Sequence, residues 1–253
     1  MTVAKVSHIA RYFLALAVGK TGEMGSITPL KLQKLVYYAQ GYHLAMAGEP
    51  LFAEVIQAWA HGPVVPELYH QYKGFEHRPI PPAEGFDPGV LSEGVRRFLE
   101  DVFADRAPFT AWHLREMTHA ERPWLEAFVH GQNAEITHAS LARYFAERFR
   151  LELRDLADPA DAVLSAVLAE HPELPVMIHM ARRELDRRFG PDAVMSLSGY
   201  ADPEEDFQCA VLRVYTELPL EELKRRRNLF DEEWWLERMG GGRLLINFEP
   251  RPA

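Results

Sequence analysis

The chain has 253 residues, of which 47% are hydrophobic and 26% charged, and its net charge is −9. This length allows one large domain or two small ones, and the composition excludes a wholly disordered chain. The acidic balance argues against a general nucleic-acid binder, because phosphate binding relies on a clustered Lys/Arg surface. A single cysteine, Cys209, excludes an internal disulfide and fits a reducing cytoplasm.

Most of the acidity belongs to the C-terminal part of the chain. Residues 1–155 contain 16 Lys/Arg against 18 Asp/Glu (net −2), whereas residues 156–253 contain 12 against 19 (net −7). This step in charge suggests a second domain with a different surface and a basic partner.

The first predicted element is a helix over residues 4–18. Four apolar residues at helical spacing form its inward face: Ile9, Tyr12, Phe13 and Leu16. The apolar stretch 12–18 is too short to span a bilayer, and the sequence shows no export signal. We therefore expect a cytoplasmic protein that does not enter a membrane.

A long helix is predicted from Pro29 to about Ala47. Thr28 supplies a hydroxyl that caps free amides, and proline suits the first turn, where its missing N–H costs nothing. The apolar face of this helix consists of Leu32, Leu35, Val36, Ala39, His43 and Met46. A second face carries a cationic and aromatic strip, which consists of Lys31, Lys34, Tyr38 and Gly41. The strip is a candidate surface for an acidic, hydrophobic partner, although a solvated face with extended lysines fits the sequence equally well.

The next elements are short. Residues 54–60 alternate in polarity and predict a strand or one arm of a β-ribbon, which ends at Gly62 and Pro63. Pro66 is placed to open a short helix. Residues 76–89 are rich in proline and glycine and therefore predict an exposed loop.

Helices resume after this loop. The expected core residues of the first two are Val95, Phe98, Leu99, Val102 and Phe103, followed by Trp112, Leu114 and Met117. Thr118 and Glu121 match a capping box, which predicts that a third helix opens there and bears Trp124. Thr137 is expected to cap a last helix, which ends near Leu153.

Residues 155–161 are rich in Asp and Pro and form the expected seam between two domains. Beyond the seam, the pattern predicts helices over 162–170 and 174–189, strands over 193–197 and 209–216, a helix over 218–235 and a strand over 244–248. This order of elements is typical of a small α+β domain. The predicted fold class is therefore mainly α with a small β-ribbon, followed by a small α+β C-terminal domain.

Eleven histidines raise the question of a metal or acid–base site, since imidazole binds metals and titrates near neutral pH. Their spacing matches no zinc motif, and the chain has no serine-hydrolase elbow, phosphate-binding loop or dinucleotide fingerprint. We expect His119 to pack beside Trp124 or to bond a neighbouring backbone group, and His61 to order the turn at Gly62. The glycines at 240–242 precede a strand, so they predict a turn rather than a phosphate site.

Two further features favour structural roles. Cys209 lies in an apolar strand and is expected to be a buried structural thiol. Arg225 and Arg226 follow Glu221 and Glu222 by four residues, which favours a solvated helix face over a nucleic-acid contact.

Two adjacent tryptophans, Trp234 and Trp235, lie near the end of the last predicted helix. Neighbouring side chains on an α-helix point in different directions, so both rings cannot face inward. One ring is expected in the core, and the other is a candidate partner anchor, because tryptophan is enriched at binding hot spots.

Three spaced segments, in this order, resemble the Panacea domain, also called the SocA-like antitoxin domain. The first includes Pro29, Lys31, Leu32, Lys34, Leu35 and Tyr38; the second includes Trp59, His61, Gly62, Pro63 and Val64, with Leu68 and Tyr69 beyond; the third includes Thr118, His119, Glu121, Pro123 and Trp124. The resemblance covers residues 1–153 and leaves the C-terminal domain unassigned. It implies a helical domain at residues 1–155, and the acidic domain at 156–253 is interpreted as a module for toxin specificity or another interaction.

The resemblance also implies a function. SocA-like proteins are non-enzymatic antitoxins encoded with a toxin, so this chain is expected to bind and neutralise a cognate protein toxin without a cofactor or metal. An adaptor that carries the toxin to an ATP-dependent bacterial protease is the alternative, since some SocA-like members act this way. An alternative of another class is a metal-dependent enzyme that uses His61, His119 and Glu121. A host-defence role, for example against phage, stays open.

Overall fold

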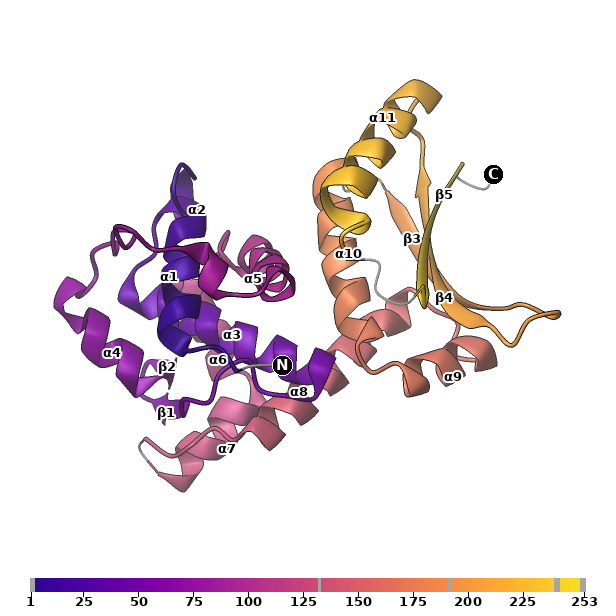
Figure 1. Ribbon diagram of the computed structural model, residues 1–253. Coiled ribbons are helices and arrows are strands. Elements are labelled where there is room, and N and C mark those ends of the chain that lie inside the picture. The colour runs from indigo at the N-terminus through magenta and orange to yellow at the C-terminus, as the bar shows by residue number, and fades with distance from the viewer. Residues whose placement is uncertain (1–2, 132, 191–192, 239–241, 251–253) are drawn as a thin grey trace. The chain divides into compact units, whose positions relative to one another are not determined.

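The computed structural model describes residues 3–131, 133–190, 193–238 and 242–250. It separates into two compact units, Met1–Phe145 and Ala146–Ala253 (Figure 1). The division lies within helix α8 (His138–Glu152), whereas the sequence placed the seam at residues 155–161. One helix therefore contributes residues to both units.

Unit 1 is built mainly from helices. Its elements are α1 (Val6–Leu16), α2 (Gly22–Gly25), α3 (Pro29–Ala47), β1 (Gln57–Trp59), β2 (Gly62–Val64), α4 (Pro66–Tyr72), η1 (Lys73–Phe75), η2 (Pro88–Val90), α5 (Glu93–Arg106), α6 (Ala111–His119), α7 (Arg122–His130) and the first part of α8. Side-chain hydroxyls accept backbone N–H groups at the starts of four of these helices, namely those of Thr28, Ser92, Thr110 and Thr137. Gly48 ends α3 in the left-handed conformation with φ 70°.

Several positions expected in the core of unit 1 are less buried, since Met46, Val95 and Met117 have intermediate exposure. Leu16 is only half-buried, and Leu14 is buried in its place on α1. Trp112 is 60% exposed because it lies in the first turn of α6, on the side away from the buried Leu114. The Arg115 guanidinium lies 4.5 Å from the centre of the Trp112 ring. Trp112 is therefore a surface aromatic residue rather than a core residue.

The predicted β-ribbon forms, and it gains a third chain segment. β1 and β2 pair antiparallel, with Trp59 opposite Gly62 across a two-residue turn. Residues 133–136 run along the other side of β1, where the Ala58 N–H donates to Ala134 O at 2.8 Å. Gly62 and Pro63 therefore belong to the second arm of the ribbon and do not simply end the first.

Unit 2 is an α+β unit. Its elements are the second part of α8, η3 (Leu153–Asp155), α9 (Ala162–Glu170), α10 (Leu174–Phe189), β3 (Val194–Ala201), β4 (Gln208–Thr216), α11 (Leu220–Phe230), the π-helical turn η4 (Asp231–Trp235) and β5 (Leu244–Pro250). β3 pairs antiparallel with β4, and β4 pairs parallel with β5. The parallel pair needs a crossover connection, which α11 and η4 supply between β4 and β5. The order of elements confirms the predicted α+β class.

Polar and aromatic contacts hold the helices of unit 2 to its sheet. Asp161 caps α9 by accepting the Leu164 N–H and also accepts the Gly199 N–H of β3, both at 2.8 Å. On α10 and α11, the rings of Phe189 and Phe230 contact Phe248 of β5, with ring centres 4.9 Å and 6.0 Å apart. α9 packs against β3 and β4, and α10 and α11 lie side by side next to the sheet (Figure 1).

The tryptophan prediction is wrong, because both Trp234 and Trp235 are buried, each with 6% exposure. They lie in a π-helical turn, where the Leu236 N–H donates to Asp231 O, five residues earlier. The wider turn brings the two adjacent rings nearly parallel, with 16° between their planes, and both stack near Phe230. Neither ring is left on the surface as a partner anchor.

The charged face of α11 and the single thiol agree with their predicted roles. Glu222 accepts from both Arg225 and Arg226, whereas Glu221 pairs with Lys224 instead of Arg225. Cys209 is buried, and burial raises the pKa of its thiol.

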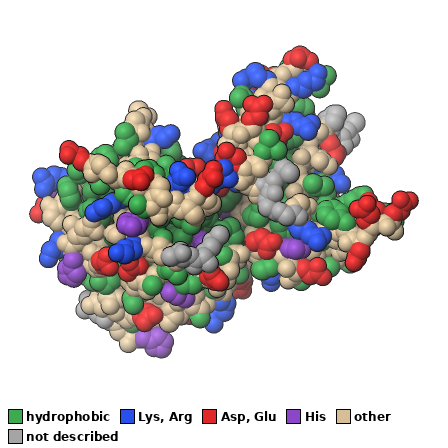
Figure 2. All heavy atoms as spheres, viewed as in Figure 1, with side chains coloured by type: hydrophobic (Ala, Val, Ile, Leu, Met, Phe, Trp, Pro, Cys, Tyr) green, Lys and Arg blue, Asp and Glu red, His purple; other side chains and the backbone are tan. Residues whose placement is uncertain are grey.

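Two remaining predictions concern the glycine turn at residues 240–242 and the absence of a membrane span. Of the predicted glycine turn at 240–242, residues 240 and 241 lie outside the described residues, and Gly242 has φ 66°. Charged side chains of both signs are spread over the visible face (Figure 2). Among the described residues, no helix has the length and apolar character needed to cross a membrane.

Gly41 offers a test of the packing around α3. A Cβ atom at this position would overlap the Phe145 ring of α8, so Gly41→Ala should destabilise the protein by about 1–3 kcal/mol. Gly94→Ala is the matched control, because Gly94 lies in helix α5 with open space around it, and this change should be neutral or stabilise by up to about 1 kcal/mol. Urea unfolding followed by circular dichroism measures both variants, and equal midpoints would contradict the packing.

Candidate functional site

The long helix α3 is buried on every side. All residues from Lys31 to Ala45 are buried, because α1, α4, α5, α6 and β2 surround the helix. The predicted exposed strip is therefore wrong, and the strip residues lie inside unit 1: Lys31, Lys34 and Tyr38 are 0% exposed, and Gly41 packs on Phe145. An enclosed helix must find partners within the protein for every polar side chain it carries.

The polar side chains of α3 bind the backbone of the segments around it. Gln33 forms two bonds with Val65, accepting its N–H at 2.8 Å and donating to its C=O at 3.2 Å. Gln40 likewise accepts the N–H of Phe52 and donates to its C=O, at 3.2 Å and 2.9 Å. Lys31 donates to Glu23 O at 2.5 Å. Each of these side chains therefore ties a neighbouring chain segment to α3 through its backbone.

Lys34 and Gly62 form a close contact under the ribbon turn. The Lys34 ammonium donates to Pro63 O at 2.9 Å. A Cβ atom at Gly62 would lie 2.7 Å from Lys34 Nζ and 2.9 Å from Thr118 Oγ1, and Gly62 has φ 95°. Only glycine meets both requirements, because it has no Cβ and adopts positive φ without strain. This contact explains the glycine of the His-Gly-Pro segment.

Glu121 does not take part in a capping box. Thr118 lies in the last turns of α6 and donates to Arg115 O at 2.9 Å, while Glu121 precedes α7 and makes no side-chain cap bond. Its carboxylate instead accepts the hydroxyls of Tyr37 and Tyr38, at 2.8 Å and 3.0 Å. Burial and the nearby Glu121 carboxylate raise the pKa of Tyr37. Glu121 is only 3% exposed, so its carboxylate accepts from these buried hydroxyls and is shielded from water.

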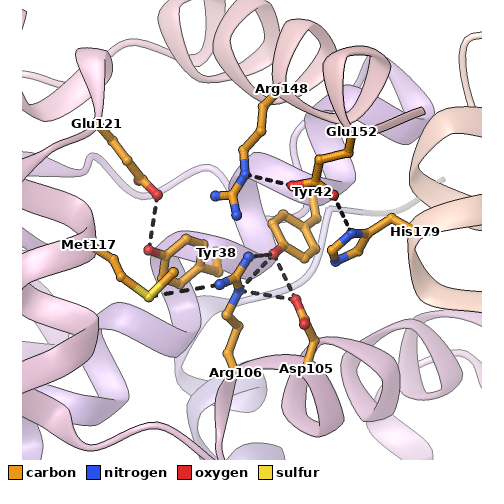
Figure 3. Close-up of polar contacts among 9 residues, drawn as sticks. All are labelled: Tyr38, Tyr42, Asp105, Arg106, Met117, Glu121, Arg148, Glu152 and His179. Atoms are coloured by element: carbon orange, nitrogen blue, oxygen red, sulfur yellow. Dashed lines mark hydrogen bonds and ion pairs between the residues drawn. The ribbon is translucent and has the colours of Figure 1, made fainter. Parts of the chain in front are cut away.

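A buried ion pair extends this polar core (Figure 3). Asp105 and Arg106 are each 3% exposed, and Arg106 Nε lies 3.0 Å from Asp105 Oδ2. Tyr42 donates to Asp105 at 2.8 Å and accepts from Arg106 Nε at 2.7 Å. The Arg106 guanidinium also lies 4.4 Å from the centre of the Tyr38 ring. The charges are thus paired and hydrogen-bonded within unit 1, as buried charges require.

Figure 3 also shows a polar contact within unit 2. Glu152 of α8 accepts from Nδ1 of His179 on α10, at 2.6 Å, and from Arg148 at 3.2 Å. Burial acts against ionisation of this carboxyl group, but the bonds from His179 and Arg148 lower the pKa of Glu152 overall.

Aromatic contacts join α7 to the ribbon. The His119 ring stacks on Trp124, with ring centres 3.9 Å apart and planes 9° apart, as the sequence predicted. Trp124 Nε1 donates to Trp59 O at 3.0 Å, and Trp59 packs edge-on against Tyr69, with ring centres 4.8 Å apart. The other residues of the three segments are core or helix-start positions: Pro29, Leu32, Leu35, Pro63, Val64 and Pro123. The three segments therefore meet in one structure around α3.

The ribbon turn also gathers cationic groups. Burial and the neighbouring Arg115 charge lower the pKa of Lys34 to about 7. Burial, followed by the charges of Arg115 and Lys34, lowers the pKa of His119. His61 lies exposed in the two-residue turn above them. The fold therefore holds these cations close together, and the exposed Glu116 pairs with Arg115 beside them.

The residues proposed for a metal-dependent enzyme do not share a ligand geometry. Glu121 is directed to the two tyrosines, His119 stacks on Trp124, and His61 lies exposed in the turn. Among the residues that the structure describes, no group of three or more His, Cys, Asp or Glu is placed to hold a metal ion.

Sequence reasoning missed most of the polar core. Gln33 and Tyr37 lie within the first of the three segments but received no role, and Gln40, Tyr42, Asp105, Arg106 and Arg115 were not singled out. Tyr37 and Tyr42 lie on the same turns of α3 as residues that were singled out, and two glutamines within a predicted helix interior were a usable sign of burial. Asp105 and Arg106 are adjacent charges at a helix end, a pattern that is also typical of solvent-exposed helices.

The Lys34 environment predicts a pH-dependent contribution to stability. Between pH 7 and 10.5 the unfolded chain binds more protons at Lys34 than the folded protein, so this group makes the folded protein more stable as pH rises. The free energy of unfolding of the wild type, minus that of Lys34→Met, should therefore rise between pH 7 and 9, by up to about 1.4 kcal/mol per pH unit.

Urea unfolding at a series of pH values from 6.5 to 9 measures this difference. Lys73→Met is the matched control, because Lys73 lies exposed on η1 and its replacement should give a difference that does not change with pH. A flat difference for Lys34→Met would show that the buried ammonium keeps its ordinary pKa.

A protein-family model matches most of the residues that form this site. Residues 32–125 match the family model described as "Antitoxin SocA-like, Panacea domain". Comparisons with curated proteins and with solved structures find no match. The matched span runs from α3 through the ribbon to the start of α7, so it contains the second and third segments and the first segment from Leu32 onward. Residues 32–125 of unit 1 are therefore similar to the SocA-like Panacea domain, as the three segments predicted.

Proposed function

We propose that this protein is an antitoxin that neutralises a cognate protein toxin by direct binding. The observation that carries the proposal is the family match at residues 32–125. The proposal includes a non-enzymatic mode of action, a cytoplasmic location and a toxin encoded by a neighbouring gene.

The geometry of unit 1 supports a binding role. Gln33, Lys34 and Gln40 are occupied with holding backbone segments, and Glu121 is occupied by two tyrosines. Such contacts fix the shape of the ribbon and the neighbouring helix ends. A surface that is rigid before binding loses less conformational entropy when a partner docks, which favours affinity. These contacts therefore favour a role in partner recognition over a role in catalysis.

A proteolytic adaptor is the second candidate within the same family. In that mechanism the protein would bind the toxin and carry it to an ATP-dependent protease, so binding would be transient and neutralisation would depend on the protease. The enzyme hypothesis based on His61, His119 and Glu121 has less support, since the Glu121 carboxylate is bonded to Tyr37 and Tyr38.

Co-expression with the neighbouring gene product tests the proposal. We expect that product to stop bacterial growth, and we expect this protein to restore growth and to co-purify with the toxin as a stable complex. Growth should also be restored in a strain that lacks the ATP-dependent proteases.

Three results separate the alternatives. Restored growth that is lost with the protease would favour the adaptor. Toxicity that this protein does not relieve would contradict the antitoxin role. An unrelated toxin of comparable toxicity is the control, and its effect on growth should not change.

Unit 2 is proposed to contribute partner choice. The turn between β3 and β4 carries the exposed Glu204, Glu205 and Asp206, and acidic side chains gather at the tip of this hairpin (Figure 2). Complementary charge accelerates association and disfavours wrong partners, so an acidic hairpin tip suits a basic toxin surface. This role rests on the charge of residues 156–253 and on the position of the tip.

Neutralising the hairpin tip tests this role. The combined variant Glu204→Gln, Glu205→Gln and Asp206→Asn should slow toxin association on the order of tenfold at low ionic strength, with a smaller effect at high salt. The matched control removes three exposed carboxylates from unit 1: Glu67→Gln, Glu76→Gln and Glu84→Gln. Surface-based kinetic binding assays measure both, and equal rates for the two variants would exclude a specific role for the tip.

A further inference from the structure

The cations under the ribbon turn have fewer partners than their chemistry demands. Lys34 Nζ is fully buried, and Pro63 O is its one acceptor among the described residues. Arg115 Nε and His119 Nε2 are also buried and have no hydrogen-bond partner in the part of the chain that the structure describes. Buried polar atoms without partners are costly and uncommon, so three incompletely satisfied nitrogen groups at one place need an explanation.

The carboxylate close to these groups in the described part of the chain is that of Glu116. Glu116 pairs with Arg115 Nη1, and the Glu116 side chain is 55% exposed. Lys34 has no carboxylate within ion-pair distance among the described residues. The Glu116 contact shows that this arginine accepts a carboxylate, and its exposure means that another carboxylate can replace it.

The cluster is reachable at its outer side. His61 is exposed in the turn between β1 and β2, and the Arg115 side chain is 18% exposed. Trp112, 60% exposed, lies under the Arg115 guanidinium. Arginine stacked on an aromatic ring is well oriented to bind a carboxylate through two parallel bonds.

We propose that the surface formed by His61, Trp112, Arg115 and His119 binds a carboxylate side chain of the protein partner, with Lys34 supplying positive charge from below. An Asp or Glu of the partner displaces Glu116 from Arg115 and meets the cluster, while apolar groups beside it cover Trp112. The identity of the occupant as a toxin side chain rests on the proposed function. The inference that this surface binds a carboxylate does not depend on the proposed function.

A titration of the full-length protein with sodium acetate tests the site without any partner. Ionic strength is held constant with sodium chloride, and the imidazole signals of His61 and His119 are followed by nuclear magnetic resonance. We expect a saturable shift of both signals. Arg115→Gln should weaken acetate binding at least about tenfold, and Glu116→Gln should strengthen it, because it removes the competing carboxylate. Arg143→Gln, which alters an exposed ion pair elsewhere in unit 1, should have no effect.

The pH dependence separates this role from a purely structural one. Arg115 and His119 of α6 interact with the Lys34 charge, while Glu116 of the same helix and His61 of the turn interact with His119. A bound anion favours the protonated lysine, so acetate affinity should fall as pH rises from 7 to 8.5. Lys34→Met should abolish this decline. Absence of a saturable shift, no effect of Arg115→Gln, or binding of inorganic phosphate but not acetate would each overturn the carboxylate site.

The toxin from the co-expression experiment then identifies the occupant. Arg115→Gln should weaken its affinity at least about tenfold while the circular dichroism spectrum stays unchanged, and Arg115→Glu should abolish neutralisation. Exchange of one toxin Asp or Glu for Lys should restore binding to Arg115→Glu. Unchanged toxin affinity in Arg115→Gln would overturn the assignment of the occupant. If the wild type binds no neighbouring gene product, the proposed function fails, and the acetate titration still decides whether the site exists.

Discussion

The enclosure of α3 on all sides is the constraint on which unit 1 depends. A helix with no solvent-facing side must satisfy each polar group inside the protein, or lose the free energy of desolvating it. Gln33 and Gln40 do so by binding backbone groups of the surrounding segments, and Lys34 binds one acceptor, Pro63 O. Those bonds also determine where the ribbon and the Phe52 segment lie. The bonds that allow α3 to be buried are therefore the same bonds that position the ribbon.

The same constraint accounts for the family residues. Tyr37 and Tyr38 bring two hydroxyls into the core, and Glu121 supplies the oxygens that accept them. Gly62 leaves room for Lys34 Nζ, and Trp124 donates to the ribbon backbone. Residues that are far apart in the sequence are thus coupled through complementary hydrogen-bonding groups. The three segments occur together in the sequence because residues of one segment bond to residues of another in the core.

The cations under the ribbon turn stand apart from this satisfied network. Asp105 and Arg106 are paired and bonded to Tyr42, whereas Lys34, Arg115 and His119 retain unused donors. The open donors next to exposed Trp112 are the basis of the proposed carboxylate site. In the proposed antitoxin role, this site would connect the shared scaffold to partner recognition.

The sequence by itself determined the helices, the hydroxyl caps at Thr28 and Thr137, the short ribbon, the α+β class of unit 2 and the resemblance of residues 32–125 to the Panacea domain, because these depend on local periodicity and on spaced motifs. Only the tertiary structure decided which faces are buried. Lys31, Lys34 and Tyr38 follow a helical spacing that suits a surface strip, yet helices on every side enclose them. Glu121 matches a cap but bonds tyrosines from another helix, and a π-turn buries both Trp234 and Trp235. In each case a contact distant in sequence outweighed the local preference, and such contacts leave no mark in the spacing of neighbouring residues.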